Sequence, residues 1–275
     1  MLLKADASGY AVPAFNYSDI WDFIAIFEAA EEMRAPIMIA SVPPVVNAIS
    51  PEICGAWGIA AMKKSTALLC HHLDHSFNVQ TCVEAIDNGY PSVMIDASKF
   101  PLDENIAIVR EVVDYAHARN VHVEGEIGLI KGRGLEGDFI GNKFLAEVED
   151  AVELAKQSGL DSMAVGVGTA HGFYEGVPEI NFARLKEIND ATDVPLVLHG
   201  GTGIPQADIE KAIKNGINKI NIGTIIHTTY MNAMRAELNE QGDNQYTIKI
   251  ALPVKDKIKE VVKNWIKVCG ADNKA

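Results

Sequence analysis

Eight short apolar runs recur along the chain, and amphipathic segments separate them. The runs span residues 11–15, 36–40, 66–73, 92–96, 121–127, 162–168, 195–200 and 217–223. In the segment 104–120, the residues Ile106, Val109, Val113 and Ala116 recur at the spacing of one helix face. Buried strands that alternate with crossover helices are typical of repeated βα units around a parallel sheet.

Eight such units predict an α/β fold, the closed (β/α)8 TIM barrel, because an open doubly wound sheet usually has about five or six strands. The chain has 275 residues, close to the roughly 250 that such a barrel needs. No linker interrupts the pattern, so the sequence predicts a single domain over residues 1–275. An additional C-terminal amphipathic helix is expected over residues 255–270.

The connection after the fifth run, residues 129–147, is long, rich in glycine and without apolar periodicity. Loops longer than about 12–15 residues are usually functional lids or disordered segments. This loop is therefore a candidate part of a functional site.

Composition narrows the choice of partners. Hydrophobic residues make up 48% and charged residues 22% of the chain, which predicts a compact fold with a large core. The net charge of −13 argues against a nucleic acid or an anionic membrane as partner, because both require a concentrated positive surface. The first residues lack the pattern of a secretion signal, and no apolar run approaches the roughly 18 residues of a membrane span. We therefore expect a cytoplasmic protein.

Four cysteines occur far apart in the chain and form no CxxC pair. This spacing argues against a zinc ribbon and against a disulfide framework. Reduced and mostly buried thiols are the expected state.

Polar residues of the kind that bind metals and substrates follow six of the predicted strands. They are Asp74 and His75, Asp96, Glu124 and Glu126, His171, His199, and Asn221 with Thr224. In a TIM barrel the carboxyl ends of the strands form the active site. Buried carboxylates and imidazoles are costly unless they are paired or bind a metal, so we expect these side chains to converge there.

Three of these residues, His75, His171 and His199, can offer neutral nitrogens to a zinc ion and leave a coordination position open, as catalytic zinc sites do. Asp96 and Glu126 are candidates for a second metal or an alternative metal position. A structural hydrogen-bonding role for each of the two is an equal alternative.

A carboxylate beside a metal-bound substrate suits acid-base catalysis, and Asp74 is the candidate. If the strand stays extended, Asp74 and His75 point to opposite sides, and His72 shares the face of Asp74 and supports it. The other histidines receive no such role. They are His71, His117, His122 and His227, and His117 and His122 are expected at the opposite rim.

Two glycine-bearing turns, residues 199–205 and 221–224, follow the last two strands and lead into helices. Barrels commonly hold a phosphate with backbone amides at this place. An anionic ligand on an acidic chain would then be bound by local amides and a metal.

Seven segments resemble, in the same order, the segments of a known family. They are AVPAFN (11–16), HLDH (72–75), VMIDAS (93–98), VEGEIG (123–128), GTAHGFY (168–174), VPLVLHGGTGIP (194–205) and KINIGT (219–224). In these segments, and from end to end, the chain resembles the class II, zinc-dependent ketose-bisphosphate aldolases of the tagatose-bisphosphate and fructose-bisphosphate type.

The resemblance implies a role for each matching position. His75, His171 and His199 would be the zinc ligands, Asp74 the acid-base residue, and Asp96 and Glu126 ligands of an alternative or second divalent or monovalent cation. The dihydroxyacetone phosphate part of the substrate would be held by Gly172, Gly200, Gly201, Thr202, Asn221 and Thr224. A second acid-base residue would come from the loop after the fifth strand, with Glu136 as the candidate and Asp138 as its alternative.

The implied reaction is reversible cleavage of a ketose 1,6-bisphosphate or a ketose 1-phosphate into dihydroxyacetone phosphate and an aldehyde. Zinc bound to the ketone and adjacent hydroxyl oxygens would stabilise the enediolate that is left when the C3–C4 bond breaks. The partner would be a phosphorylated ketose, and the assembly a homodimer or homotetramer. The alternatives are another metal-dependent sugar-phosphate enzyme, such as an isomerase or hydrolase, and a non-catalytic aldolase-like subunit.

The sequence departs from these relatives where they bind the distal phosphate. After the second strand, where many relatives have a serine or threonine that meets this phosphate, the segment here is Ser41-Val42-Pro43-Pro44, and proline offers no N–H donor. Near the C-terminus, Lys274 stands in place of an arginine and lacks its bidentate fork. We therefore expect an aldehyde half other than glyceraldehyde 3-phosphate, or a phosphate that is held differently.

Overall fold

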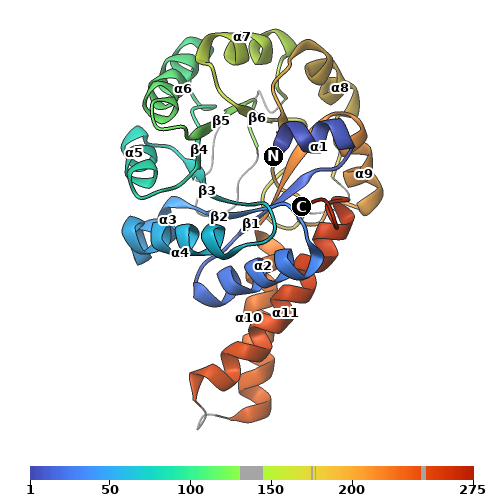
Figure 1. Ribbon diagram of the computed structural model, residues 1–275. Coiled ribbons are helices and arrows are strands. Elements are labelled where there is room, and N and C mark those ends of the chain that lie inside the picture. The colour runs from blue at the N-terminus through green and yellow to red at the C-terminus, as the bar shows by residue number, and fades with distance from the viewer. Residues whose placement is uncertain (131–144, 175, 177, 243–245) are drawn as a thin grey trace.

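Eight parallel strands close into a barrel in their order along the chain, and β8 pairs with β1 (Figure 1). The strands are β1 (Val12–Asn16), β2 (Ile37–Ser41), β3 (Leu69–Ser76), β4 (Ser92–Ile95), β5 (His122–Ile127), β6 (Ser162–Val165), β7 (Leu196–Leu198) and β8 (Ile217–Ile222). The computed structural model describes residues 1–130, 145–174, 176, 178–242 and 246–275. The predicted TIM barrel is confirmed.

Helices surround the barrel and supply the crossovers between consecutive strands (Figure 1). They are α1 (Leu2–Ser8), α2 (Ile20–Met33), α3 (Pro43–Ile49), α4 (Pro51–Lys64), α5 (Val79–Asp87), α6 (Leu102–His117), α7 (Val148–Ser158), α8 (Phe182–Ala191), α9 (Gln206–Lys214), α10 (Thr224–Gln241) and α11 (Thr247–Val268). Local sequence fixes their ends. At the start of α2, for example, Asp19 and Asp22 form a reciprocal capping box.

The strands are buried on both faces, as expected of a parallel sheet covered by helices. Most buried apolar side chains form one large cluster between the sheet and the helices. Met94, Ala164 and Val197 form a separate cluster. Since β4 and β6 are not neighbours in the sheet, a contact between Met94 and Ala164 must cross the barrel interior.

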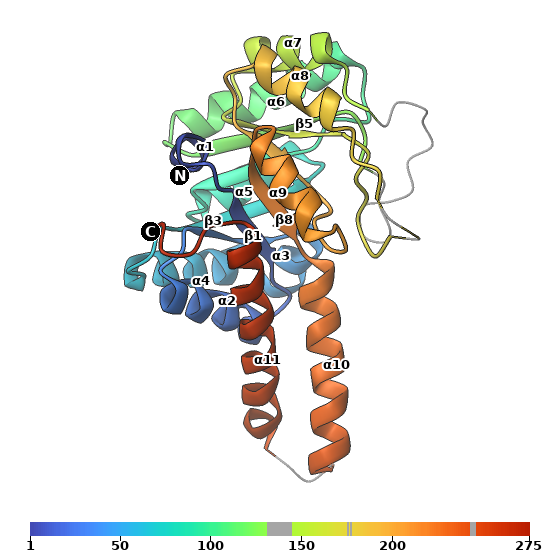
Figure 2. The same cartoon turned by 90° about the vertical axis from the view of Figure 1, so that its right-hand side faces the viewer.

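The last two helices extend beyond the barrel as an antiparallel pair (Figure 2). α11 begins at Thr247, eight residues earlier than the sequence predicted, and it continues through Pro253. The middle of α11 packs along α2, where Lys255 and Lys259 both bond to Glu28. The buried apolar face of α11, which includes Ile258, packs against the hydrophobic core.

Two strands end two or three residues earlier than their apolar runs suggested. β6 ends at Val165 and β7 at Leu198, and each is followed by a glycine with positive φ, Gly168 (101°) and Gly200 (70°). In β6 and β7 the apolar run therefore continues past the end of the strand, into the turn at the rim of the barrel.

Within the described part of the chain, no single helix is long and apolar enough to cross a membrane; α3 and α4 meet that test only as a pair bent by 102°. The cysteines are free thiols, and three of the four are buried. Reduced thiols were the expected state.

Candidate active site

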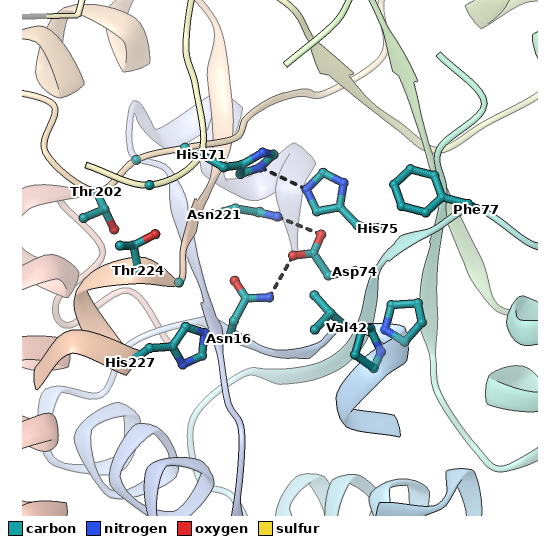
Figure 3. A pocket seen from close by; sticks show the side chains of 16 residues that line it. Asn16, Val42, Asp74, His75, Phe77, His171, Thr202, Asn221, Thr224 and His227 are labelled. Atoms are coloured by element: carbon teal, nitrogen blue, oxygen red, sulfur yellow. Dashed lines mark hydrogen bonds between the residues drawn. The ribbon is translucent and has the colours of Figure 1, made fainter. Parts of the chain in front are cut away.

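A cavity of about 390 Å³ opens at the carboxyl ends of the strands (Figure 3). Strand ends and the turns after them supply its polar lining. These residues are Asn16, Asp74, His75, His171, Gly172, Gly200, Gly201, Thr202, Asn221, Gly223, Thr224 and His227. Convergence of the predicted site residues at this end of the barrel is what the sequence led us to expect.

Three histidines meet beside this cavity. Nε2 of His75 lies 3.1 Å from Nε2 of His171 and 2.7 Å from Nδ1 of His199. The ring of His75 stands edge-on to the other two, at 82° and 83°. β3 carries His75, whereas His171 and His199 lie in the turns after β6 and β7.

This geometry fits a metal ion. Ligand atoms of His75, His171 and His199 all lie within 4.8 Å of one another. Nitrogens that face each other this closely need a proton or a cation between them. Burial lowers the pKa of His199 to about 4, which favours its neutral, metal-binding form. Three imidazoles beside an open cavity form the ligand set of catalytic zinc.

The end of β3 brings Asp74 and His75 to the same cavity. A regular strand would have pointed them to opposite sides. Here the register between β3 and β4 shifts between Leu73 and Ser76, and His75 adopts a φ of 49°. Extended structure therefore does not persist through His75, and both side chains reach the site.

Two asparagines hold the carboxylate of Asp74. Asn16 on β1 donates from Nδ2 to Oδ2 across 2.8 Å, and Asn221 on β8 donates from Nδ2 to Oδ1 across 2.9 Å (Figure 3). Burial opposes ionisation of Asp74, but electrostatic interactions with His75, His199 and Lys219 outweigh it and hold the pKa well below its usual range. The buried side chain is therefore an ionised acceptor with a fixed orientation.

A second group of possible ligands shares His75. It contains Asp96 and Glu126, and Nδ1 of His75 lies 3.7 Å from Oδ2 of Asp96. Burial and the charge of Asp96 raise the pKa of Glu126 well above its ordinary value. Oγ of Ser98 lies 2.7 Å from Oδ1 of Asp96 and 3.2 Å from Oε1 of Glu126. The arrangement fits a cation, and it equally gives both carboxylates a hydrogen-bonding role.

The glycine turns form the opposite wall of the cavity. A Cβ at Gly200 would lie 2.2 Å from the carbonyl oxygen of Ala170, and one at Gly201 would lie 2.9 Å from that of Asn221. Thr202 accepts from the amide of Ile225 at the start of α10. Only glycine allows these backbones to lie so close together, at a place suited to an anion.

Other sequence predictions have different outcomes. His117 and His122 both lie near Asp161, which precedes β6, so they are at the opposite rim as expected. Lys274 also lies at that end, with its Nζ over the ring of Tyr10 before β1, and not at the cavity. The predicted loop residues Glu136 and Asp138 lie outside the described residues.

Two polar side chains of the cavity received no role from the sequence. Asn16 ends β1, so the same test that singled out six strand ends could have found it. His227 lies three residues after Thr224 on the first turn of α10, and its Nδ1 is 3.1 Å from Oγ of Ser18. Helical spacing from Thr224 was the available signal. His72 supports the site differently than expected, through Ser92 and Lys219.

Comparisons with known proteins agree with this geometry. The family described as "Fructose-bisphosphate aldolase class-II" matches residues 1–274. A fructose-bisphosphate aldolase of Staphylococcus epidermidis is 38% identical over 283 residues, covering 100% of this chain and 97% of that protein.

Solved structures are similar over the same length. The YdjI aldolase of Escherichia coli K12 is 31% identical with a TM-score of 0.86, covering 100% of this chain and 96% of that one. A putative fructose-1,6-bisphosphate aldolase of Coccidioides immitis is 26% identical with a TM-score of 0.90, covering 99% and 96%. A fructose-bisphosphate aldolase of Campylobacter jejuni, at 20% identity and a TM-score of 0.78, is similar in fold.

Proposed function

The chain belongs to the class II fructose-bisphosphate aldolase family of metal-dependent lyases, and on that premise we propose the reaction that it catalyses. The protein reversibly cleaves a ketose 1,6-bisphosphate or a ketose 1-phosphate into dihydroxyacetone phosphate and an aldehyde. One observation carries this proposal. The three-histidine group lies next to Asp74, a buried carboxylate that two asparagines orient at the same cavity.

His75, His171 and His199 would hold the zinc ion of this family. When bound, the ion supplies a Lewis acid that polarises the substrate carbonyl and favours negative charge beside it. The chain supplies the rest. Burial of His75 and His199 keeps water from two sides of the ligand set, while the half-buried His171 faces the open cavity. Asp96 and Glu126 would hold a second cation or an alternative position of the metal.

Asp74 would take the proton of the C4 hydroxyl during cleavage and return it during condensation. Its ionised form is the one that accepts a proton, and the low pKa ensures that this form prevails near neutral pH. Asn16 and Asn221 restrict the carboxylate to one orientation, which reduces the entropy that the reaction must lose. A second acid-base residue would act at the carbon of dihydroxyacetone phosphate, with Glu136 as the candidate and Asp138 as its alternative.

The glycine turns after β6, β7 and β8 would hold the phosphate of dihydroxyacetone phosphate. The residues are Gly172, Gly200, Gly201, Thr202, Asn221 and Thr224, all of which line the cavity. Backbone amides at the start of α10 add a favourable partial positive charge. The phosphate would thus anchor the substrate with its carbonyl toward the histidines.

The part of the cavity wall that follows β2 indicates which aldehyde half the substrate has. Val42, Pro43 and Pro44 line the cavity there, with Phe77 from the turn after β3 (Figure 3). These side chains offer no hydrogen-bond donor, and Lys274 is at the other end of the barrel. They support an aldehyde half other than glyceraldehyde 3-phosphate, or a phosphate that is held differently. A strong preference for a bisphosphate over the matching ketose 1-phosphate would contradict the first of these.

We further propose that residues 1–275 form one catalytic domain and that it assembles as a homodimer or homotetramer. Analytical ultracentrifugation of the purified chain separates a monomer from either assembly.

The test of the reaction is aldol cleavage by zinc-loaded protein. Release of dihydroxyacetone phosphate is measured from a panel of ketose 1-phosphates and 1,6-bisphosphates, with EDTA-treated protein as the control. Metal-dependent release is the expected result, and its rates rank the substrates. If zinc-bound protein releases dihydroxyacetone phosphate from none of the sugars, the result would instead support an isomerase or a non-catalytic subunit.

A further inference from the structure

A buried ion pair joins β5 to β8 beneath the three histidines. Nζ of Lys219 donates to Oε2 of Glu124 across 2.6 Å, and the two side chains are 0% and 1% exposed. Burial of two charges carries a desolvation penalty that their attraction only roughly offsets, and apolar replacements are often at least as stable. Stability alone therefore does not account for a lysine and a glutamate in the interior of the barrel.

The second oxygen of Glu124 reaches one of the three histidines. Oε1 lies 2.9 Å from Nε2 of His199, while Nδ1 of the same ring lies 2.7 Å from Nε2 of His75. A carboxylate only accepts hydrogen bonds, and a neutral imidazole carries one N–H. Nε2 of His199 must therefore carry the proton, which leaves the lone pair of Nδ1 directed at the metal position.

Asn221 is not an alternative acceptor for this proton, because its amide nitrogen can only donate. Its Nδ2 lies 3.3 Å from Nε2 of His199 and donates to Asp74 across 2.9 Å. Glu124 is thus the acceptor for His199, and the orientation of Asn221 is determined by Asp74.

Lys219 in turn is held by a second contact. Its Nζ lies 3.4 Å from Nε2 of His72, and Nδ1 of His72 lies 2.8 Å from Oγ of Ser92. Oγ of Ser162 adds a long contact of 3.5 Å to Oε2 of Glu124. The carboxylate is therefore held directly from β6 and β8 and, through Lys219 and His72, indirectly from β3 and β4, so little freedom remains for it to rotate away from His199.

We propose that Glu124 is a positioning residue that fixes the tautomer and the orientation of His199, and that Lys219 holds Glu124 in place for this task. The proposal rests on the proposed function only in taking His199 as a metal ligand. Partners of this kind orient metal-bound histidines, and their loss typically weakens metal binding by about 10–100-fold.

The test compares three variants by their affinity for zinc, measured by competition with a chromophoric chelator. Glu124→Gln keeps the shape of the side chain, but its amide cannot accept from His199 and from Lys219 at once. In Glu124→Gln/Lys219→Met the glutamine oxygen is free to accept from His199, and neither buried charge remains. The control is Glu28→Gln, which breaks a lysine-paired glutamate on α2, away from the histidines.

We expect Glu124→Gln to bind zinc about 10–100-fold more weakly than the wild type and to change the visible absorption spectrum of bound Co²⁺. The double variant should bind more weakly than the wild type and more tightly than Glu124→Gln, and Glu28→Gln should match the wild type. If Glu124→Gln does not fold, the zinc affinity and the Co²⁺ spectrum of the double variant are compared with those of the wild type instead.

Wild-type zinc affinity and an unchanged Co²⁺ spectrum in Glu124→Gln, or in the double variant if Glu124→Gln does not fold, would overturn the proposal, because a purely structural ion pair affects only the melting temperature. Wild-type protein that binds no zinc would overturn it together with the metal site. Weakened zinc binding in a protein that cleaves no ketose phosphate would support the positioning role and contradict only the proposed reaction.

Discussion

Asn221 on β8 donates from Nδ2 to Oδ1 of Asp74 on β3 across 2.9 Å, although two strands separate them in the barrel. Asn16 on β1 occupies the other carboxylate oxygen across 2.8 Å. Two donors and a nearly complete exclusion of water, at 2% exposure, keep Asp74 in one orientation. Closure of the barrel is what brings these three strand ends together.

Asp74→Asn should lower kcat by about 10²–10⁴, because an amide cannot accept the proton of the substrate hydroxyl. Asparagine also presents a donor to one of the two asparagines that now donate to Asp74. Zinc content should stay that of the wild type, since Asp74 is not among the three histidine ligands. Steady-state kinetics together with metal analysis check this prediction. Asp193→Asn, at an exposed position, is the control. A variant with near wild-type kcat would exclude Asp74 as the acid-base residue.

Zinc should raise the melting temperature of the wild type. This rise should be lost when one of the histidine ligands is removed. At a free zinc concentration about 100 times Kd, binding contributes about 2.7 kcal/mol, or about 5–10 °C in Tm for a chain of this size. In His171→Ala the shift should nearly vanish, because two imidazoles remain. His117→Ala is the matched control, since this histidine lies at the opposite rim beside Asp161. Equal zinc-induced shifts in the two variants would contradict the assignment of His171.

The barrel could be predicted from the sequence because βα alternation repeats along the whole chain, and the site because its residues follow strand ends. Other features depend on tertiary structure. β3 was expected to end at residue 73 but runs to Ser76, since its polar end, with Asp74 and His75, resembles a loop. A left-handed conformation at His75 is unusual for a residue other than glycine, and no local sequence signal indicates it.

The barrel interior was the least predictable part. Lys219 lies within an apolar run and resembles a solvent-exposed residue of a strand, yet it is fully buried and paired with Glu124. Pairing across β5 and β8 follows from closure of the sheet, which periodicity alone does not specify. His227 was missed for a related reason, because its approach to the cavity depends on where α10 starts.

Gly200→Ala should weaken substrate binding, in addition to the loss of stability that a left-handed alanine causes. The new Cβ would lie 2.2 Å from the carbonyl oxygen of Ala170, so the turn must move away from the proposed phosphate position. Gly9→Ala is the matched control, because Gly9 has a similar φ, 67° against 70°, and no atom of the described residues lies within 4 Å of its Cβ position. Both variants share the strain of a left-handed alanine, about 1–2 kcal/mol.

The difference between the two variants should appear in KM for the ketose phosphate, which we expect to rise at least tenfold in Gly200→Ala. In Gly9→Ala it should remain that of the wild type. Comparable KM values in the two variants would mean that the turn after β7 does not contact the substrate.

The stability of the fold should depend on pH through Glu31, which links α2 to the turn before β3. Its carboxylate accepts hydrogen bonds from Ser65, Thr66 and Ala67. Partial burial opposes ionisation, but these hydrogen bonds outweigh it and lower the pKa of Glu31 from 4.5 to about 2. Between these values the unfolded chain binds more protons than the native state does.

The contribution of Glu31 is therefore complete above about pH 4.5 and is lost as the pH falls towards 2. Glu31→Gln should lower the free energy of unfolding by about 1–2 kcal/mol at pH 7, allowing for partial solvent exposure. The difference from the wild type should shrink as the pH is lowered from 5 towards 3, which urea denaturation at a series of pH values measures. Glu111→Gln, at an exposed position on α6, should follow the wild-type curve. A constant difference at every pH would mean that Glu31 acts through its shape, because only an ionised carboxylate gives a contribution that protonation removes.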